Sequence, residues 1–147
     1  MGCVMADPLA DFMAAMMASG EPGLIINTGS KQGITTPPGD PAYNTAKAGV
    51  KVVTEALQHQ LRNTAGCAIT AHLLIPGFVF TELTAQGRSE KPAGAWTADE
   101  TAGKPHPLML QELMAEFDVP PERLLMIGDT THDLQMAQNA GCASVGV

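Results

Sequence analysis

Short apolar runs bounded by glycine or proline alternate along this sequence with longer segments typical of helices. The short runs, which have the length of strands, lie at residues 24–27, 68–75, 124–127 and 142–147. The longer segments lie at residues 8–19, 41–62, 108–117 and 130–139. A parallel strand pair needs a crossover connection, and helices of this length supply one. The alternation therefore predicts an α/β fold with about four mainly parallel strands flanked by helices in three layers.

Glycine and proline indicate where these elements end. Gly141 predicts the end of the last helix, and Thr130 or Thr131 predicts its N-cap. Residues 33–41 are rich in glycine and proline, so we expect a loop there. We also expect irregular structure over residues 87–107, where the same two residue types recur.

Length and charge limit the classes of partner. The chain has 147 residues and a formal net charge of −7, from 8 Lys and Arg against 15 Asp and Glu. This length suits one domain of ordinary size. The cations are few and scattered, so we expect no nucleic-acid partner. No apolar run approaches the roughly 20 residues of a membrane helix, so we expect no membrane partner either.

The cysteines and the first residues indicate a cellular compartment. Cys3, Cys67 and Cys142 lie far apart, which favours reduced thiols over a disulfide framework. The opening MGCVMADPLADFM has no basic segment and contains two aspartates, so we do not expect a secretory signal. Both observations predict a cytoplasmic location.

Ser30, Tyr43 and Lys47 form a first candidate constellation for catalysis. Tyr43 and Lys47 are four residues apart on a predicted helix and therefore share one face. An ammonium near a phenol favours the phenolate and makes the tyrosine a usable acid or base. Ser30 follows a predicted strand, where α/β sheets place their ligands.

Residues 5–100 resemble the catalytic half of the short-chain dehydrogenases/reductases. The resemblance rests on four landmarks in order: LIINTGS ending at Ser30, YNTAK from Tyr43 to Lys47, Ile75-Pro76-Gly77, and Thr81. It implies that Ser30 positions a substrate carbonyl and Tyr43 transfers the proton. Lys47 would lower the pKa of Tyr43 and hold a ribose, and Pro76-Gly77 would line a nicotinamide.

The sequence departs from this family in two places. It contains no opening strand with a glycine-rich turn for the cofactor pyrophosphate, and no asparagine near Met1 where the family has its fourth catalytic residue. Hydride transfer without the dinucleotide platform has no source of hydride. We therefore do not expect NAD(P) as a cofactor.

Asp129 and Asp133 form a second candidate constellation, four residues apart at a predicted strand-to-helix turn. Hard divalent cations such as Mg²⁺ or Ca²⁺ prefer oxygen ligands, and two converging carboxylates suit them. The alternative is structural: Asp129 would cap the helix, and Asp133 would complement the helix dipole in its first turn.

Residues 102–147 resemble the C-terminal part of haloacid-dehalogenase-type phosphatases, phosphoglycolate phosphatases in particular. The resemblance rests on GKPHPL from Gly103, the run PERLLMIGDTTHDLQ from Pro121, and Ala140-Gly141. It implies that Lys104 steadies the phosphate, while Asp129 and Asp133 hold Mg²⁺. The family's Asp-x-Asp nucleophile after an apolar strand has no counterpart, because Asp7 and Asp11 follow no strand.

The sequence thus reads as two partial α/β enzymes joined near residues 101–104, by natural recombination or by deliberate joining. We expect residues 1–101 and 102–147 to pack as one compact, Rossmann-like composite. A sheet this small should have reactive edges, so we expect homo-oligomerisation to cover them.

Three functions remain open for such a chain. The first is a hydrolase acting on a small molecule. It would use either Ser30 with a Tyr43 or Lys47 base on esters and lactones, or a metal at Asp129 and Asp133 on phosphate esters. The second is an NAD(P)-dependent oxidoreductase, and the third is a folded protein without catalysis. We favour the hydrolase because it needs neither a dinucleotide nor an aspartyl nucleophile.

Overall fold

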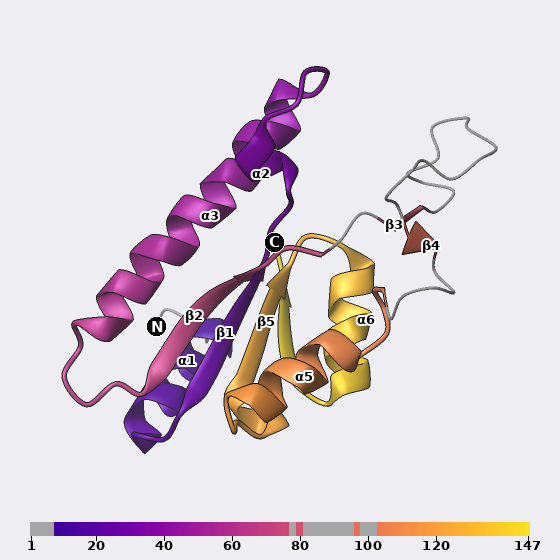
Figure 1. Cartoon of the computed structure of the whole chain (residues 1–147). Coiled ribbons are helices and arrows are strands. Elements are labelled where there is room, and N and C mark those ends of the chain that lie inside the picture. The colour runs from indigo at the N-terminus through magenta and orange to yellow at the C-terminus, as the bar shows by residue number, and fades with distance from the viewer. Residues whose placement is uncertain (1–7, 77–78, 81–95, 98–102) are drawn as a thin grey trace, which may run out of the picture.

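Four parallel strands form one sheet in the order β2-β1-β5-β6 (Figure 1). The structure is a computed structural model that describes residues 8–76, 79–80, 96–97 and 103–147. The strands are β1 (Gly23–Thr28), β2 (Ile69–Leu74), β5 (Leu124–Gly128) and β6 (Ala143–Gly146). The central strands β1 and β5 come from the two parts of the sequence, and Ile25 pairs with both Ala71 and Leu125.

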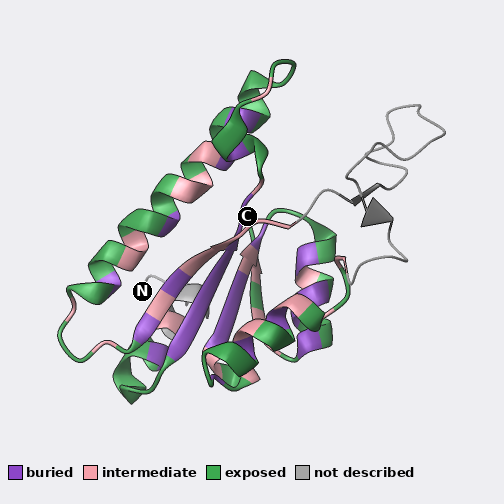
Figure 2. Cartoon of the chain, in the orientation of Figure 1, coloured by how far each residue is buried: buried purple, intermediate pink, exposed green. Residues whose placement is uncertain are grey.

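Helices cover both faces of the sheet, as the predicted three-layer α/β fold requires. On one face, α1 (Pro8–Ser19) and α3 (Pro41–Arg62) contribute Met16 and Leu61 to a core with Ile25 and Leu125. On the other, α5 (Leu108–Glu116) and α6 (Thr131–Ala140) pack on the alternate residues of β1 and β5. Figure 2 shows these two strands as the most continuously buried elements. The parallel sheet with helices on both faces confirms the predicted α/β fold class.

The strand order reverses between β1 and β5. From β1 the chain passes through α3 to β2 on one side, and from β5 it passes through α6 to β6 on the other side. In open parallel sheets, ligands bind at the carboxyl ends of the strands at such a switch point. The fold therefore places its natural binding position after Thr28 of β1 and Gly128 of β5.

The caps of α6 match the sequence prediction. Thr130 is the N-cap and forms a capping box with Asp133, and Gly141 ends the helix with a φ of 77°. A positive φ is costly for residues with a Cβ atom, which explains the glycine. At the start of α3, the Asp40 side chain accepts a hydrogen bond from the backbone N–H of Tyr43.

Two short elements differ from the predicted loops. Residues 32–35 form the helix α2 (Gln32–Thr35), which Gly33 allows to pack on α3: a Cβ there would lie 2.5 Å from the backbone carbon of Lys47. In the region predicted to be irregular, β4 (Trp96–Thr97) pairs with β3 (Val79–Phe80). None of the helices in the described part of the chain has the length and apolar character needed to cross a membrane.

Candidate functional site at the switch point

The side chain of Lys47 reaches from α3 to the carboxyl ends of β1 and β5. Its Nζ atom lies 2.7 Å from Oδ2 of Asp129 and donates a longer hydrogen bond, 3.4 Å, to the carbonyl oxygen of Thr28. The Lys47 side chain is 5% exposed, whereas the Asp129 side chain is 39% exposed. The ammonium is thus enclosed, and Asp129 is the member of the pair that solvent reaches.

A second ion pair lies beside the first. Lys104 Nζ is 2.7 Å from Oδ1 of Asp133, whose side chain is completely buried. Burial alone would raise the pKa of Asp133, but hydrogen bonds from Lys104, Thr130 and Thr28 and the charge of Lys104 outweigh it. The pKa of Asp133 therefore lies below its ordinary value, and the carboxylate stays ionised at neutral pH.

Thr28 links the two ion pairs. Its carbonyl oxygen accepts a hydrogen bond from Lys47, and its hydroxyl donates one of 3.2 Å to Oδ1 of Asp133. Sequence reasoning did not single out Thr28. The available signal was a hydroxyl residue at the end of a buried strand, two positions before Ser30. Four predicted site residues, Lys47, Lys104, Asp129 and Asp133, therefore belong to one network.

Ser30 and Tyr43 lie outside this network. Ser30 Oγ accepts a hydrogen bond of 3.3 Å from the backbone N–H of Gln32, and among the described residues this is its only one. Tyr43 is 39% exposed, with Lys47 Nζ 5.7 Å from the centre of its ring. The structure thus brings Lys47 near Tyr43 but bonds its ammonium to Asp129. Gly77 and Thr81, two landmarks of the resemblance, lie outside the described residues.

The paired aspartates do not fit a divalent cation as they stand. All four hydrogen bonds to the Asp133 carboxylate come from protein donors: Lys104 and Thr28 on Oδ1, and the backbone and hydroxyl of Thr130 on Oδ2. Asp129 is bonded to Lys47. Among the residues that the structure describes, no three His, Cys, Asp or Glu side chains come close enough to hold a metal ion. Metal binding by this pair stays a prediction that would require displacement of a lysine.

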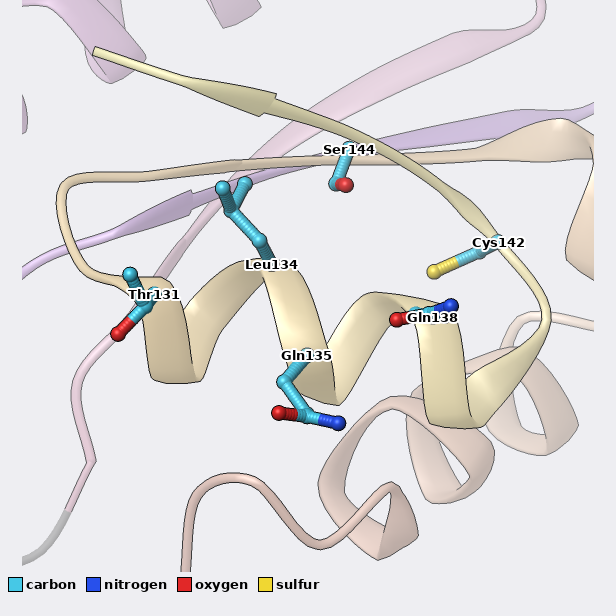
Figure 3. A pocket seen from close by; sticks show the side chains of 6 residues that line it. All are labelled: Thr131, Leu134, Gln135, Gln138, Cys142 and Ser144. Atoms are coloured by element: carbon cyan, nitrogen blue, oxygen red, sulfur yellow. The ribbon is translucent and has the colours of Figure 1, made fainter.

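An open pocket of about 460 Å³ lies apart from this network, along α6 and β6. Figure 3 shows its lining, which is formed by Thr131, Leu134, Gln135, Gln138, Cys142 and Ser144. Burial raises the pKa of the Cys142 thiol to about 11, so the thiolate that nucleophilic chemistry needs is scarce at neutral pH. The pocket contains none of the residues predicted for the site.

Two family models match the chain, one for each of its parts. The short chain dehydrogenase model matches residues 7–92, and the HAD-hydrolase-like model matches residues 101–147. Both resemblances predicted from the sequence are therefore confirmed, and residues 93–100 lie between the two matches.

Two curated relatives illustrate how much of the chain is matched. A phosphoglycolate phosphatase from Vibrio vulnificus (strain YJ016) is 46% identical over 44 residues, which are 30% of this chain and 19% of that protein. A phosphonoacetaldehyde hydrolase from Bacillus cereus (strain G9842) is 34% identical over 112 residues, 73% of this chain and 40% of that protein. The chain spans about a fifth of the length of the phosphoglycolate phosphatase it matches.

A solved structure of a predicted phosphoglycolate phosphatase from Haemophilus somnus 129PT is similar at 30% identity and a TM-score of 0.38. The match covers 66% of this chain and 42% of that one. The short chain dehydrogenase model, in contrast, covers more than half of this sequence. The chain therefore belongs to the short chain dehydrogenase family, and its last third matches the HAD-like hydrolases.

Proposed function

We propose that this protein is a hydrolase of small phosphate esters whose reacting groups lie at the switch point between β1 and β5. The observation that carries the proposal is the network of two ion pairs there, Lys47 with Asp129 and Lys104 with Asp133. The names of the phosphatases to which this chain is similar, and the match of residues 101–147 to the HAD-hydrolase-like model, support the choice of phosphate esters over other substrates.

Asp129 is the general base in this proposal. It is the partly exposed carboxylate of the network, whereas Asp133 is enclosed and fully hydrogen-bonded. A water oxygen attacks phosphorus, the bond to the ester oxygen breaks, and Asp129 takes the proton of the water and passes it to the leaving alkoxide. Lys104, 21% exposed, supplies positive charge toward the anionic substrate. Asp133 holds Lys104 in place.

The sequence-based prediction of a phosphate-ester hydrolase also included a divalent metal at Asp129 and Asp133. The relatives' family implies Mg²⁺, which would polarise the phosphoryl group or activate water when bound. Because the two carboxylates already have ammonium partners, no step of the proposed reaction passes through a metal. Inhibition by EDTA would favour the metal-dependent form of the proposal.

Hydrolysis of carboxylic esters or lactones is the second candidate. It is favoured by the half-buried hydroxyl of Ser30, which accepts a hydrogen bond from Gln32 and keeps its own proton free among the described residues. Ser30 Oγ would add to the carbonyl carbon and the alcohol would leave with the proton. Water would then release the acid from the acyl-enzyme.

An NAD(P)-dependent oxidoreductase remains the alternative from a different class, because the chain belongs to the short chain dehydrogenase family. In the described geometry, however, the Lys47 ammonium is bonded to Asp129 and the Thr28 carbonyl. A change in Trp96 fluorescence on addition of NADPH would favour the oxidoreductase. If the protein turns over none of these substrates, the remaining alternative is a folded protein without catalysis.

The test compares hydrolysis of p-nitrophenyl phosphate and p-nitrophenyl acetate, with and without EDTA, by four purified proteins. These are the unaltered protein, Asp129→Asn, Ser30→Ala, and the control Glu55→Gln on the exposed face of α3. We expect phosphate hydrolysis to fall about 100-fold or more in Asp129→Asn, as for loss of a general base. It should persist in Ser30→Ala and in Glu55→Gln. Loss of acetate hydrolysis in Ser30→Ala alone supports the second candidate. Activity equal in all four proteins contradicts both.

We also propose that the protein forms homo-oligomers in the cytoplasm. The outer strands β2 and β6 of the described sheet leave backbone groups unpaired, which favours association with a second copy. Val52 and Val53 on α3, each 62% exposed, add apolar surface. A monomeric mass by light scattering in dilute solution would contradict the oligomer.

A further inference from the structure

Each carboxylate at the switch point already has a cation of its own. Asp129 contacts Lys47, and Asp133 contacts Lys104, both at 2.7 Å. Two lysines and two aspartates sum to zero formal charge. A divalent cation placed between the carboxylates would therefore add two positive charges to a group that is already neutral.

Asp133 has no capacity left for a metal ion. An ionised carboxylate offers about four lone-pair positions. Four donors use them: Lys104 Nζ and Thr28 Oγ1 on Oδ1, and the backbone N–H and the hydroxyl of Thr130 on Oδ2. The side chain is also fully enclosed, so water cannot accompany a cation to it.

Lys47 is held at Asp129 by the fold as well as by charge. Its ammonium also donates to the carbonyl of Thr28, and its side chain is 5% exposed. The backbone at Lys47 is fixed by the close approach of α2 at Gly33. A cation that took its place would have to break both hydrogen bonds and leave a buried ammonium without a partner, which is costly.

We propose that the ammonium of Lys47 occupies the cation position at Asp129, so that the folded protein closes this acidic pair to divalent metals. The residue comes from the part of the chain that matches short chain dehydrogenases, and the carboxylate comes from the part that matches HAD-like hydrolases. The joined parts thus place an internal lysine where a divalent cation would otherwise contact Asp129. This inference concerns metal binding alone and does not depend on the proposed hydrolase activity.

The test measures binding of Mn²⁺ by electron paramagnetic resonance, without any substrate. The proteins are the unaltered chain, Lys47→Met, the double variant Lys47→Met/Asp129→Asn, and the control Lys51→Met, which removes the exposed Lys51–Glu55 pair. We expect no Mn²⁺ bound to the unaltered protein or to Lys51→Met at about 1 mM metal. Lys47→Met frees the Asp129 carboxylate and the Thr28 carbonyl oxygen as ligands, whereas Asp133 keeps its four donors. We expect Lys47→Met to bind Mn²⁺ at least about tenfold more tightly than the unaltered protein, and the double variant to lose that binding.

Two results would overturn the inference. One is a single Mn²⁺ bound by the unaltered protein as tightly as by Lys47→Met and lost in the double variant Lys47→Met/Asp129→Asn. The other is no gain of binding in Lys47→Met when its circular dichroism and unfolding curve show a folded protein. If Lys47→Met does not fold, Lys47→Gln replaces it, because its amide can still donate to the Thr28 carbonyl. The same two results then decide the matter.

Discussion

The Lys47 ammonium and the Asp129 carboxylate, 82 positions apart in the sequence, lie 2.7 Å from each other. Lys47 belongs to the part that matches short chain dehydrogenases, and Asp129 to the part that matches HAD-like hydrolases. Strands β1 and β5 pair directly beneath them, so the contact and the sheet join the same two parts. The candidate residues of both families therefore share one end of one sheet.

Loss of Lys104 should destabilise the protein strongly. Lys104→Met leaves the fully buried carboxylate of Asp133 without its charged partner. We expect a loss of about 2–4 kcal/mol in the free energy of unfolding, since the hydrogen bonds from Thr28 and Thr130 remain. Urea denaturation at neutral pH measures it. The control Lys51→Met, which breaks an exposed pair, should cost less than about 1 kcal/mol. Equal losses in the two variants would show that Asp133 does not need Lys104.

Acid should remove the stabilising effect of Asp133. Its pKa in the folded protein lies below the ordinary value of 3.8, so the folded state favours the ionised form. The resulting stabilisation is complete above pH 3.8 and is lost as the pH falls through the lower, folded-state pKa. We expect the free-energy difference between the unaltered protein and Asp133→Asn to shrink over that range. A difference that stays constant down to about pH 2 would contradict the assigned hydrogen bonds.

Two glycines should respond in opposite ways to alanine. A Cβ at Gly128 would collide with the Cβ of Asp133, whereas a Cβ at Gly49, on α3, would meet nothing within 4 Å. We expect Gly128→Ala to lose about 1–3 kcal/mol of stability through overpacking. Gly49→Ala should gain about 0.5–1 kcal/mol, because alanine is the better helix former. Thermal denaturation followed by circular dichroism checks both, and a gain at Gly128 would refute the described packing of α6 against β5.

The elements of this fold follow from local patterns in the sequence. The spacing of apolar residues predicts residues 41–62 as a helix, and the structure has α3 over the same residues. The run at residues 24–27 predicts a strand buried on both faces, which β1 is. Glycine at position 141 predicts the end of α6, and the structure ends the helix there with the left-handed backbone that glycine favours. Such signals depend only on residues close together in the chain.

Pairing between distant elements could not be predicted in the same way. That β5 lies beside β1, and that Lys47 contacts Asp129, depends on how the helices pack on the sheet. The short helix α2 was missed because glycine and proline dominate the residues around it. Its stability comes from packing of Gly33 on α3, which no local pattern contains.

The central claim is that Lys47 and Asp129 form one site across the two parts of the chain. A double-mutant cycle with Lys47→Met and Asp129→Asn measures their coupling in the free energy of unfolding. Lys47 is buried and Asp129 is partly exposed, so we predict a coupling of about 1–2 kcal/mol, between the values of exposed and enclosed pairs. The same cycle with Lys51→Met and Asp129→Asn should be additive. Additivity within about 0.3 kcal/mol for the Lys47 cycle would contradict the claim.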